Sequence, residues 1–239
     1  MKVKKLIGRT GWVTAVLLAL VAIMSIVVRT VSVTGALTLP PDALLEHYEP
    51  AFADTDPESF EGRYDAHPVL TLVHILPGFL VMILGPLQFV GKIRSRHIQV
   101  HRWSGRIFVS AALVSGVAAM VITFVFPVFG SFTAPAAMMF FGPIFLFSVV
   151  KAYLHIRRRE ILQHREWMIR AFALALGVST FRVLLNVFLI AGVSFPEAWE
   201  TVVWLGFATN MVIAEVWINV TRPSRHEAMP AGGSIAARR

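Results

Sequence analysis

The chain contains 239 residues, of which 56% are hydrophobic and only 15% are charged, and its mean hydropathy is +0.68. One water-soluble core cannot bury that much apolar surface, so the composition excludes an ordinary soluble domain and predicts that lipid surrounds the protein. The chain has no cysteine, which excludes disulfides, thiolate metal sites and iron–sulfur clusters. A net charge of +8 suits a nucleic-acid-binding protein only if the basic residues form one soluble face.

Six apolar runs are long enough to cross a bilayer, whose hydrocarbon layer of roughly 30 Å takes about 20 helical residues. They lie at about 11–31, 68–91, 104–128, 133–155, 167–193 and 199–220. No run alternates like a barrel strand, and lipid cannot satisfy a bare backbone, so each run is predicted to be a helix. The predicted fold class is all-α: a polytopic membrane helical bundle of six transmembrane helices, in which the second to fifth form a four-helix core.

The predicted spans divide the chain into four segments. These are an N-terminal transmembrane helix (1–35), an acidic extracytoplasmic loop (36–66), a five-helix membrane core (67–220) and a disordered cytoplasmic tail (221–239). Lys2, Lys4 and Lys5 before the first apolar run also resemble the start of a secretory signal peptide. The run is long for such a peptide and lacks a clear A-x-A site, which favours a retained helix.

The distribution of basic residues predicts the orientation. Nearly all of the 22 Lys and Arg residues lie in the N-terminal tip, in the loops after the second and fourth predicted helices, and in the tail. By the positive-inside rule both termini are cytoplasmic, in a bacterial inner membrane, and the acidic loop faces outward. Because topology explains the positive charge, we expect no nucleic-acid partner. The expected partners are the lipid bilayer and anionic lipid headgroups at the cytoplasmic face.

Two similar strings stand where a basic loop meets an apolar run, "HIQVHRWSGR" at 97–106 and "ILQHREWMIR" at 161–170. Each places positive charge near the N-terminus of an outward-running helix, where it opposes the helix dipole unless an anion is bound. The strings therefore predict an anionic partner. The residues concerned are His101, Arg102 and Arg106 in the first string and His164, Arg165 and Arg170 in the second.

Two anionic partners fit this pattern. The first is phospholipid phosphate, with Trp103 and Trp167 as interfacial anchors. The second is a cofactor with anionic arms, such as haem b, whose iron takes axial imidazoles from facing helices. His101 and His164 would then be the metal ligands, and the arginines of the two strings would hold the anionic arms. Stripes of small residues behind the histidines mark where helices or a flat ligand approach closely.

Two further polar residues fall inside predicted spans. His74 lies roughly 10 Å below the outer surface, where it either makes a helix-packing hydrogen bond or takes part in ligand binding or proton transfer. Arg182 stands near the bilayer midplane, where an arginine costs about 2.5–3.5 kcal/mol and so requires a partner. The favoured partner is Glu215 on the last helix, and the alternative is an anionic ligand, a quinone or a haem edge.

The stretches "HILPGFLVMILGPLQF", "HRWSGRIF" and "HREWMIRAFA" resemble the bacterial membrane proteins catalogued as domain of unknown function 2306. The resemblance covers roughly residues 67–190 and implies a helical membrane fold, but it implies no activity. A more distant similarity is to cytochrome b-type membrane proteins, which hold two haems with histidines from a four-helix core. The fourth predicted helix here has no histidine within the membrane, so His74 lacks a partner and only one haem, between His101 and His164, is expected.

These observations favour a membrane redox or haem-handling component, with His101 and His164 as ligands, the arginines around them, and His74 and Arg182 in the interior. The alternative is a non-redox transporter or assembly factor in which His74, Arg182 and Glu215 form the substrate or proton path. No GxSxG, HExxH or Walker motif is present, so hydrolase and NTPase chemistry is not indicated. Whether the protein is an enzyme stays open at this point.

Overall fold

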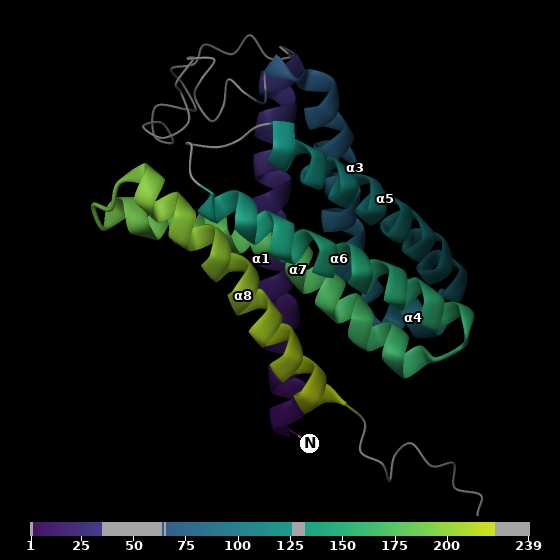
Figure 1. Ribbon diagram of the computed structural model, residues 1–239. Coiled ribbons are helices and arrows are strands. Elements are labelled where there is room, and N and C mark those ends of the chain that lie inside the picture. Colours follow the sequence, from purple (N-terminus) through teal and green to yellow (C-terminus); the bar gives the residue numbers. More distant parts are fainter. Residues whose placement is uncertain (1, 35–63, 65, 126–131, 223–239) are drawn as a thin grey trace, which may run out of the picture.

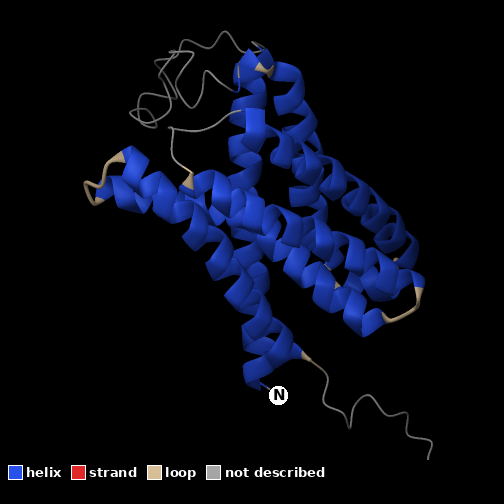
Figure 2. Cartoon of the chain, viewed as in Figure 1, coloured by secondary structure: helices blue, strands red, loops and turns tan. Residues whose placement is uncertain are grey.

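The computed structural model describes residues 2–34, 64, 66–125 and 132–222, and within these ranges every regular element is a helix (Figure 2). The helices are α1 (Lys2–Thr34), α3 (Pro68–Gln88), α4 (Gly91–Arg96), α5 (Ile98–Val125), α6 (Thr133–Arg157), α7 (Ile161–Ile190) and α8 (Phe195–Thr221). Most of the predicted acidic loop and of the predicted tail lies outside the described residues.

Six of these helices are long and apolar enough to cross a membrane. They correspond to the six predicted spans, so the all-α membrane bundle is confirmed. The short basic helix α4 was not predicted, because it carries no apolar run. Both α5 and α7 begin six residues before the predicted span, since a nucleated helix continues readily through polar residues. As a result His101 and His164 are each the fourth residue of a helix and not part of a loop.

The second to fifth spans pack as a ring, which confirms the predicted four-helix core. Helix α3 packs against α5, α5 against α6, α6 against α7, and α7 against α3 (Figure 1). Over the described residues the backbones of α5 and α7 do not approach each other closely, so the two helices face each other across the ring. Helix α1 packs on α3 and α7, and α8 packs along α7. In Figure 1 the N-terminus and the end of α8 lie close together below the ring.

The interior of the ring is filled by aromatic and aliphatic side chains. Phe108 of α5 and Phe172 of α7 are 0% and 3% exposed, and their ring centroids are 6.3 Å apart. The predicted small-residue stripes do face this interior, but they accommodate side chains of neighbouring helices: a Cβ added to Gly85 on α3 would overlap the ring of Phe172. The stripes therefore explain close helix packing.

A tight turn joins α7 to α8. Gly192 has a φ of +84°, which glycine adopts without strain. Ser194 then precedes α8 in an extended conformation, and its hydroxyl donates a hydrogen bond of 2.7 Å to the Glu197 carboxylate. Because the turn is short, it determines the antiparallel register of the two helices. Residues equally distant from the turn therefore lie side by side.

Candidate functional site

The end of the ring at which α5 and α7 begin carries α4 and the basic loop after α6, and is called the basic end below. Helix α1 closes one side of it, since the Trp12 indole donates a hydrogen bond of 3.3 Å to the Pro86 carbonyl at the end of α3. Helix α8 also ends here, and a Cβ added to Gly11 would overlap the Trp217 ring. Both termini of the helical bundle therefore lie at the basic end.

His101 and His164 lie at this end on opposite corners of the ring, and His164 lies within electrostatic range of His101. The Nδ1 atom of His164 is 2.8 Å from the Ala152 carbonyl on α6. A carbonyl only accepts, so this Nδ1 carries the proton and the neutral ring keeps a lone pair on Nε2. The Nδ1 atom of His101 is buried and has no hydrogen-bond partner in the described part of the chain.

Arg165 supplies a second buried donor beside the histidines. Its Nη2 donates a hydrogen bond of 2.6 Å to the Thr221 hydroxyl on α8, whereas its Nη1 is buried without a partner among the described residues. The exposed Arg94 of α4 lies within electrostatic range of both Arg165 and His101. The N-termini of α5 and α7 add partial positive charge. An anionic group beside Arg165 would satisfy its buried Nη1 donor.

Arg170, the last residue of the second string, already has an anionic partner. Its Nε and Nη2 donate to the two carboxylate oxygens of Glu215 on α8, at 2.5 and 3.0 Å, and its guanidinium lies over the Trp167 ring at 4.7 Å. This bidentate geometry is the strong form of the arginine–carboxylate pair. Arg170 is therefore a structural link between α7 and α8.

The predicted pair Arg182–Glu215 is wrong, because Glu215 pairs with Arg170. The register of the α7–α8 hairpin is the physical reason. Arg170 and Glu215 stand equally far from the turn at Gly192, whereas Arg182 is twelve residues nearer to it, or about 18 Å along the helix. An extended arginine side chain does not reach that far.

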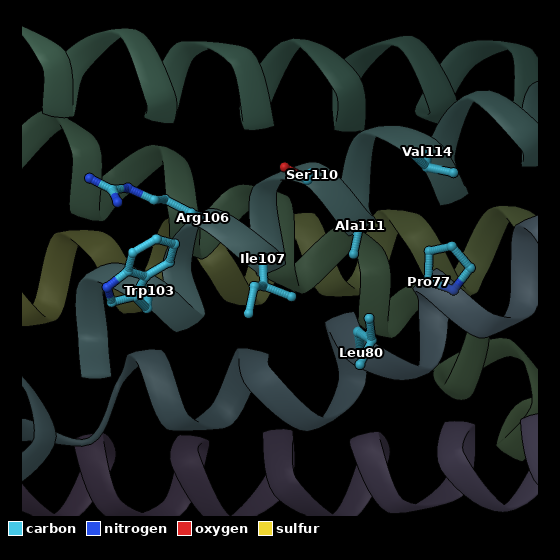
Figure 3. Close-up of a pocket in the computed structure, with 8 residues that line it drawn as sticks. All are labelled: Pro77, Leu80, Trp103, Arg106, Ile107, Ser110, Ala111 and Val114. Atoms are coloured by element: carbon cyan, nitrogen blue, oxygen red, sulfur yellow. The ribbon is translucent and has the colours of Figure 1, made fainter. Parts of the chain in front are cut away.

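The two exposed arginines of the first string differ in position. Arg102 directly follows His101 and is exposed. Arg106 lies about 140° around α5 from His101, with its guanidinium over the Trp103 ring at 4.9 Å. It lines a groove of about 370 Å³ between α3 and α5, on the outer surface of the ring (Figure 3). Arg106 and His101 therefore serve different faces of α5.

His74 and Arg182 belong to a second cluster at the opposite end of the ring. The His74 Nδ1 donates to the Ser115 carbonyl at 2.9 Å, and the Ser115 hydroxyl donates to the His74 carbonyl at 2.9 Å. This is the helix-packing bond expected of a buried histidine. Arg182 lies within electrostatic range of His74 and of Tyr64. Burial raises the pKa of the Tyr64 hydroxyl, although the charges of Arg29 and Arg182 act in the opposite direction.

The eight residues predicted for one site thus fall into separate places. His101, His164 and Arg165 meet at the basic end, with Arg102 beside them, while Arg170 is paired and Arg106 faces the outer groove. His74 and Arg182 lie beyond the aromatic layer of Phe108 and Phe172. Among the described residues, no group of three or more His, Asp or Glu side chains is placed to hold a metal ion.

A comparison with protein families agrees with this fold. A family model described as "Predicted membrane protein (DUF2306)" matches residues 71–218. The chain belongs to this family. The matched range contains His74, both His-Arg strings and Glu215, so it includes the histidines of both polar clusters of this DUF2306 protein. No curated protein and no solved structure matches the chain.

Several residues of the basic end were not recognised in the sequence of this DUF2306 protein. Arg94 and Thr221 stand outside the repeated strings, and Ala152 takes part through its carbonyl, for which a sequence pattern has no signal. The Arg170–Glu215 pair did have a signal, since counting outward from the glycine turn brings the two residues together.

Proposed function

We propose that this integral membrane protein binds an anionic ligand at the basic end, and that the basic end faces the cytoplasm of a bacterial inner membrane. The orientation follows from the concentration of Arg and Lys at this end, because cytoplasmic loops carry the excess of basic residues. One observation supports the ligand: two buried side-chain nitrogens, His101 Nδ1 and the donor Arg165 Nη1, lack partners among the described residues. A buried donor without a partner costs about 1–3 kcal/mol, which a bound anion would relieve.

Haem b is the ligand we propose, and it makes the protein a membrane redox or haem-handling component. The donor set fits: imidazoles of facing helices are common haem ligands, and His164 keeps a lone pair on Nε2 with its Nδ1 oriented by a backbone carbonyl. Arg165 and Arg94 are placed for anionic arms. When bound, haem supplies one-electron chemistry.

The aromatic core limits where such a ligand lies. The aromatic side chains of Phe108 and Phe172 fill the interior of the four-helix ring next to the small-residue stripes. A flat ligand therefore lies at the mouth of the basic end, above these rings, and does not extend toward His74. One ligand at the basic end, and no second one deeper in the membrane, is the arrangement that the packing supports.

An absorption spectrum of the purified full-length protein, expressed with added haem precursor, tests this proposal. We expect a Soret band and sharp reduced bands that are lost in His101→Ala and in His164→Ala. The matched control is His97→Ala, which removes an exposed histidine from the same string, four residues before His101. Arg165→Gln should weaken haem retention while keeping the band positions, because it removes a donor to the anionic arms and no axial ligand.

A colourless protein with adequate haem supply, or bands unchanged in both histidine variants, would contradict the haem proposal. The second candidate is a non-redox transporter or assembly factor. It is favoured by the presence of two polar clusters, at His101 and at His74, separated by the Phe108–Phe172 layer. In that case Phe172→Ala should change substrate flux or partner binding, and the protein should remain colourless.

A further inference from the structure

A groove on the outer surface of the ring carries a different chemistry from the basic end. It lies between α3 and α5 and has a volume of about 370 Å³. Its lining is Pro77, Leu80, Trp103, Arg106, Ile107, Ser110, Ala111 and Val114. Figure 3 shows the arginine and the tryptophan at one end of the groove and Pro77 with Val114 at the other. Seven of the eight residues bear no charge, so the groove is an open, largely apolar depression on the surface with one cation at its end.

The length and position of the groove match one leaflet of a bilayer. From Trp103 to Val114 it follows α5 for eleven residues, or about 16 Å, which is about half of the hydrocarbon thickness. The charged end lies near the start of α5, at the basic end. An extended acyl chain running inward from the headgroup region would therefore lie along it.

The cation at the end of the groove lacks the anionic partner that its counterpart has. Arg170 stacks on Trp167 and pairs with Glu215. Arg106 likewise follows Trp103 by three residues and lies over its ring at 4.9 Å. No carboxylate pairs with Arg106 in the described part of the chain. Trp103 is 63% exposed, as expected of a residue at a lipid headgroup. The missing anion at Arg106 is therefore expected to come from the lipid.

We infer that the α3–α5 groove is a binding site for one anionic phospholipid. Its phosphate contacts the Arg106 guanidinium beside Trp103, and one acyl chain follows the groove past Ile107 and Ser110 toward Val114 and Pro77. The site is independent of the proposed haem function, because His101 faces away from it and no residue of the groove contacts the histidines through a hydrogen bond.

A lipid competition experiment on the full-length detergent-solubilised protein tests the site. Unlabelled lipids displace a fluorescent phosphatidylglycerol, and energy transfer from tryptophan to the fluorescent lipid measures how much of it stays bound. We expect phosphatidylglycerol to compete more strongly than phosphatidylcholine, and glycerol phosphate alone to compete weakly, since the chain and the headgroup both contribute. Arg106→Gln should reduce the preference for phosphatidylglycerol about fivefold, and Arg106→Lys should largely restore it. Ser110→Phe should fill the groove and weaken both lipids.

Two matched controls separate the groove from the general membrane surface. Arg157 also lies over an aromatic ring, Tyr153 at 6.0 Å, at the end of α6, so Arg157→Gln removes an equivalent charge outside the groove. Val117 is exposed on α5 but does not line the groove, so Val117→Phe places a phenyl ring on the same helix outside the groove. Thermal unfolding of each variant shows whether it is folded.

Three results would overturn the site. The first is equal competition by the two phospholipids in the wild type. The second is an unchanged preference for phosphatidylglycerol in folded Arg106→Gln. The third is a loss of lipid binding in Arg157→Gln and Val117→Phe as large as that in Arg106→Gln and Ser110→Phe. Competition by glycerol phosphate as strong as that by phosphatidylglycerol would show a headgroup site without a chain, which also contradicts the inference. If Arg106→Gln does not fold, the site is tested by comparing Ser110→Phe with Val117→Phe, and equal lipid binding by these two variants would overturn it.

Discussion

The two His-Arg strings have nearly the same residues but different surroundings. On α7 the His164, Arg165 and Arg170 side chains each make a bond to the protein: His164 to Ala152, Arg165 to Thr221 and Arg170 to Glu215, although Arg165 Nη1 has no partner among the described residues. On α5 the corresponding His101 Nδ1 has no partner among the described residues, and Arg102 and Arg106 are exposed. The second string is therefore linked to α8 by two of its arginines, whereas within the described ranges the first string makes no such link through its arginines.

The difference comes from α8. It packs along α7, where Ile169 lies against Ala214 and Ile218, and it brings Glu215 and Thr221 to the arginines of the second string. No helix in the described part of the chain covers the corresponding flank of α5, where Trp103 and Ile107 are exposed. A sequence repeat therefore indicates equivalent helices but not equivalent neighbours, and the uncovered copy is the better place to look for ligands.

The largest expected effect on stability concerns the second string, where Glu215 pairs with Arg170. Glu215→Gln removes the anion from Arg170, whose side chain is only 17% exposed, and breaking a buried ion pair in this way costs about 3–5 kcal/mol. Because Glu215 is 44% exposed, we expect about 3 kcal/mol, or a Tm in detergent lower by roughly 6–12 °C. Thermal unfolding measures it.

The control for this prediction is Glu166→Gln. Glu166 pairs with Arg222, which is 49% exposed, so its loss should cost less than about 1 kcal/mol. A swap of the buried pair, Arg170→Glu with Glu215→Arg, should recover part of the lost Tm. Equal shifts for the two glutamate variants would show that α8 does not stabilise the second string through this pair.

An intermediate effect should distinguish the two histidines. In ligand-free protein, His164→Leu removes the hydrogen bond to Ala152 and should lower the free energy of unfolding by about 1 kcal/mol. His101→Leu removes a buried nitrogen that has no partner among the described residues and should raise the free energy of unfolding by about 1 kcal/mol. Denaturant unfolding of both variants measures the difference. If His101→Leu is the more destabilising, His101 has a structural partner and the proposed ligand site loses its main support.

The smallest effect concerns the helix ends. Thr221→Val removes the hydroxyl that accepts from Arg165, and because this end of α8 is partly exposed we expect a loss of about 0.5 kcal/mol in the free energy of unfolding. Thr201→Val is the control, since the Thr201 hydroxyl is exposed and bonds only to the backbone of its own helix. Indistinguishable Tm values for the two variants would mean that the Arg165–Thr221 bond adds no stability.

The positions of most site residues could be predicted from the sequence, but their ion-pair and packing partners could not. The strings correctly indicated that His101 and His164 lie at matching positions near helix starts, because hydropathy and charge change there along the chain. Residue type alone wrongly assigned Glu215 to Arg182, since any carboxylate suits any arginine. The correct assignment to Arg170 required the register set by Gly192. The small-residue stripes likewise showed which faces approach closely, but not that Phe172 would fill the space.

The sequence by itself determined the six apolar spans, the all-helical fold and the faces that turn inward. These follow from length, hydropathy and helical periodicity, which are local properties of each segment. Only the tertiary structure decided that α5 and α7 stand across the ring, that Glu215 neutralises Arg170, and that Arg106 borders a groove without a carboxylate. Those outcomes depend on which helix covers which flank, and that is decided by turns and by side-chain packing between segments distant in the sequence.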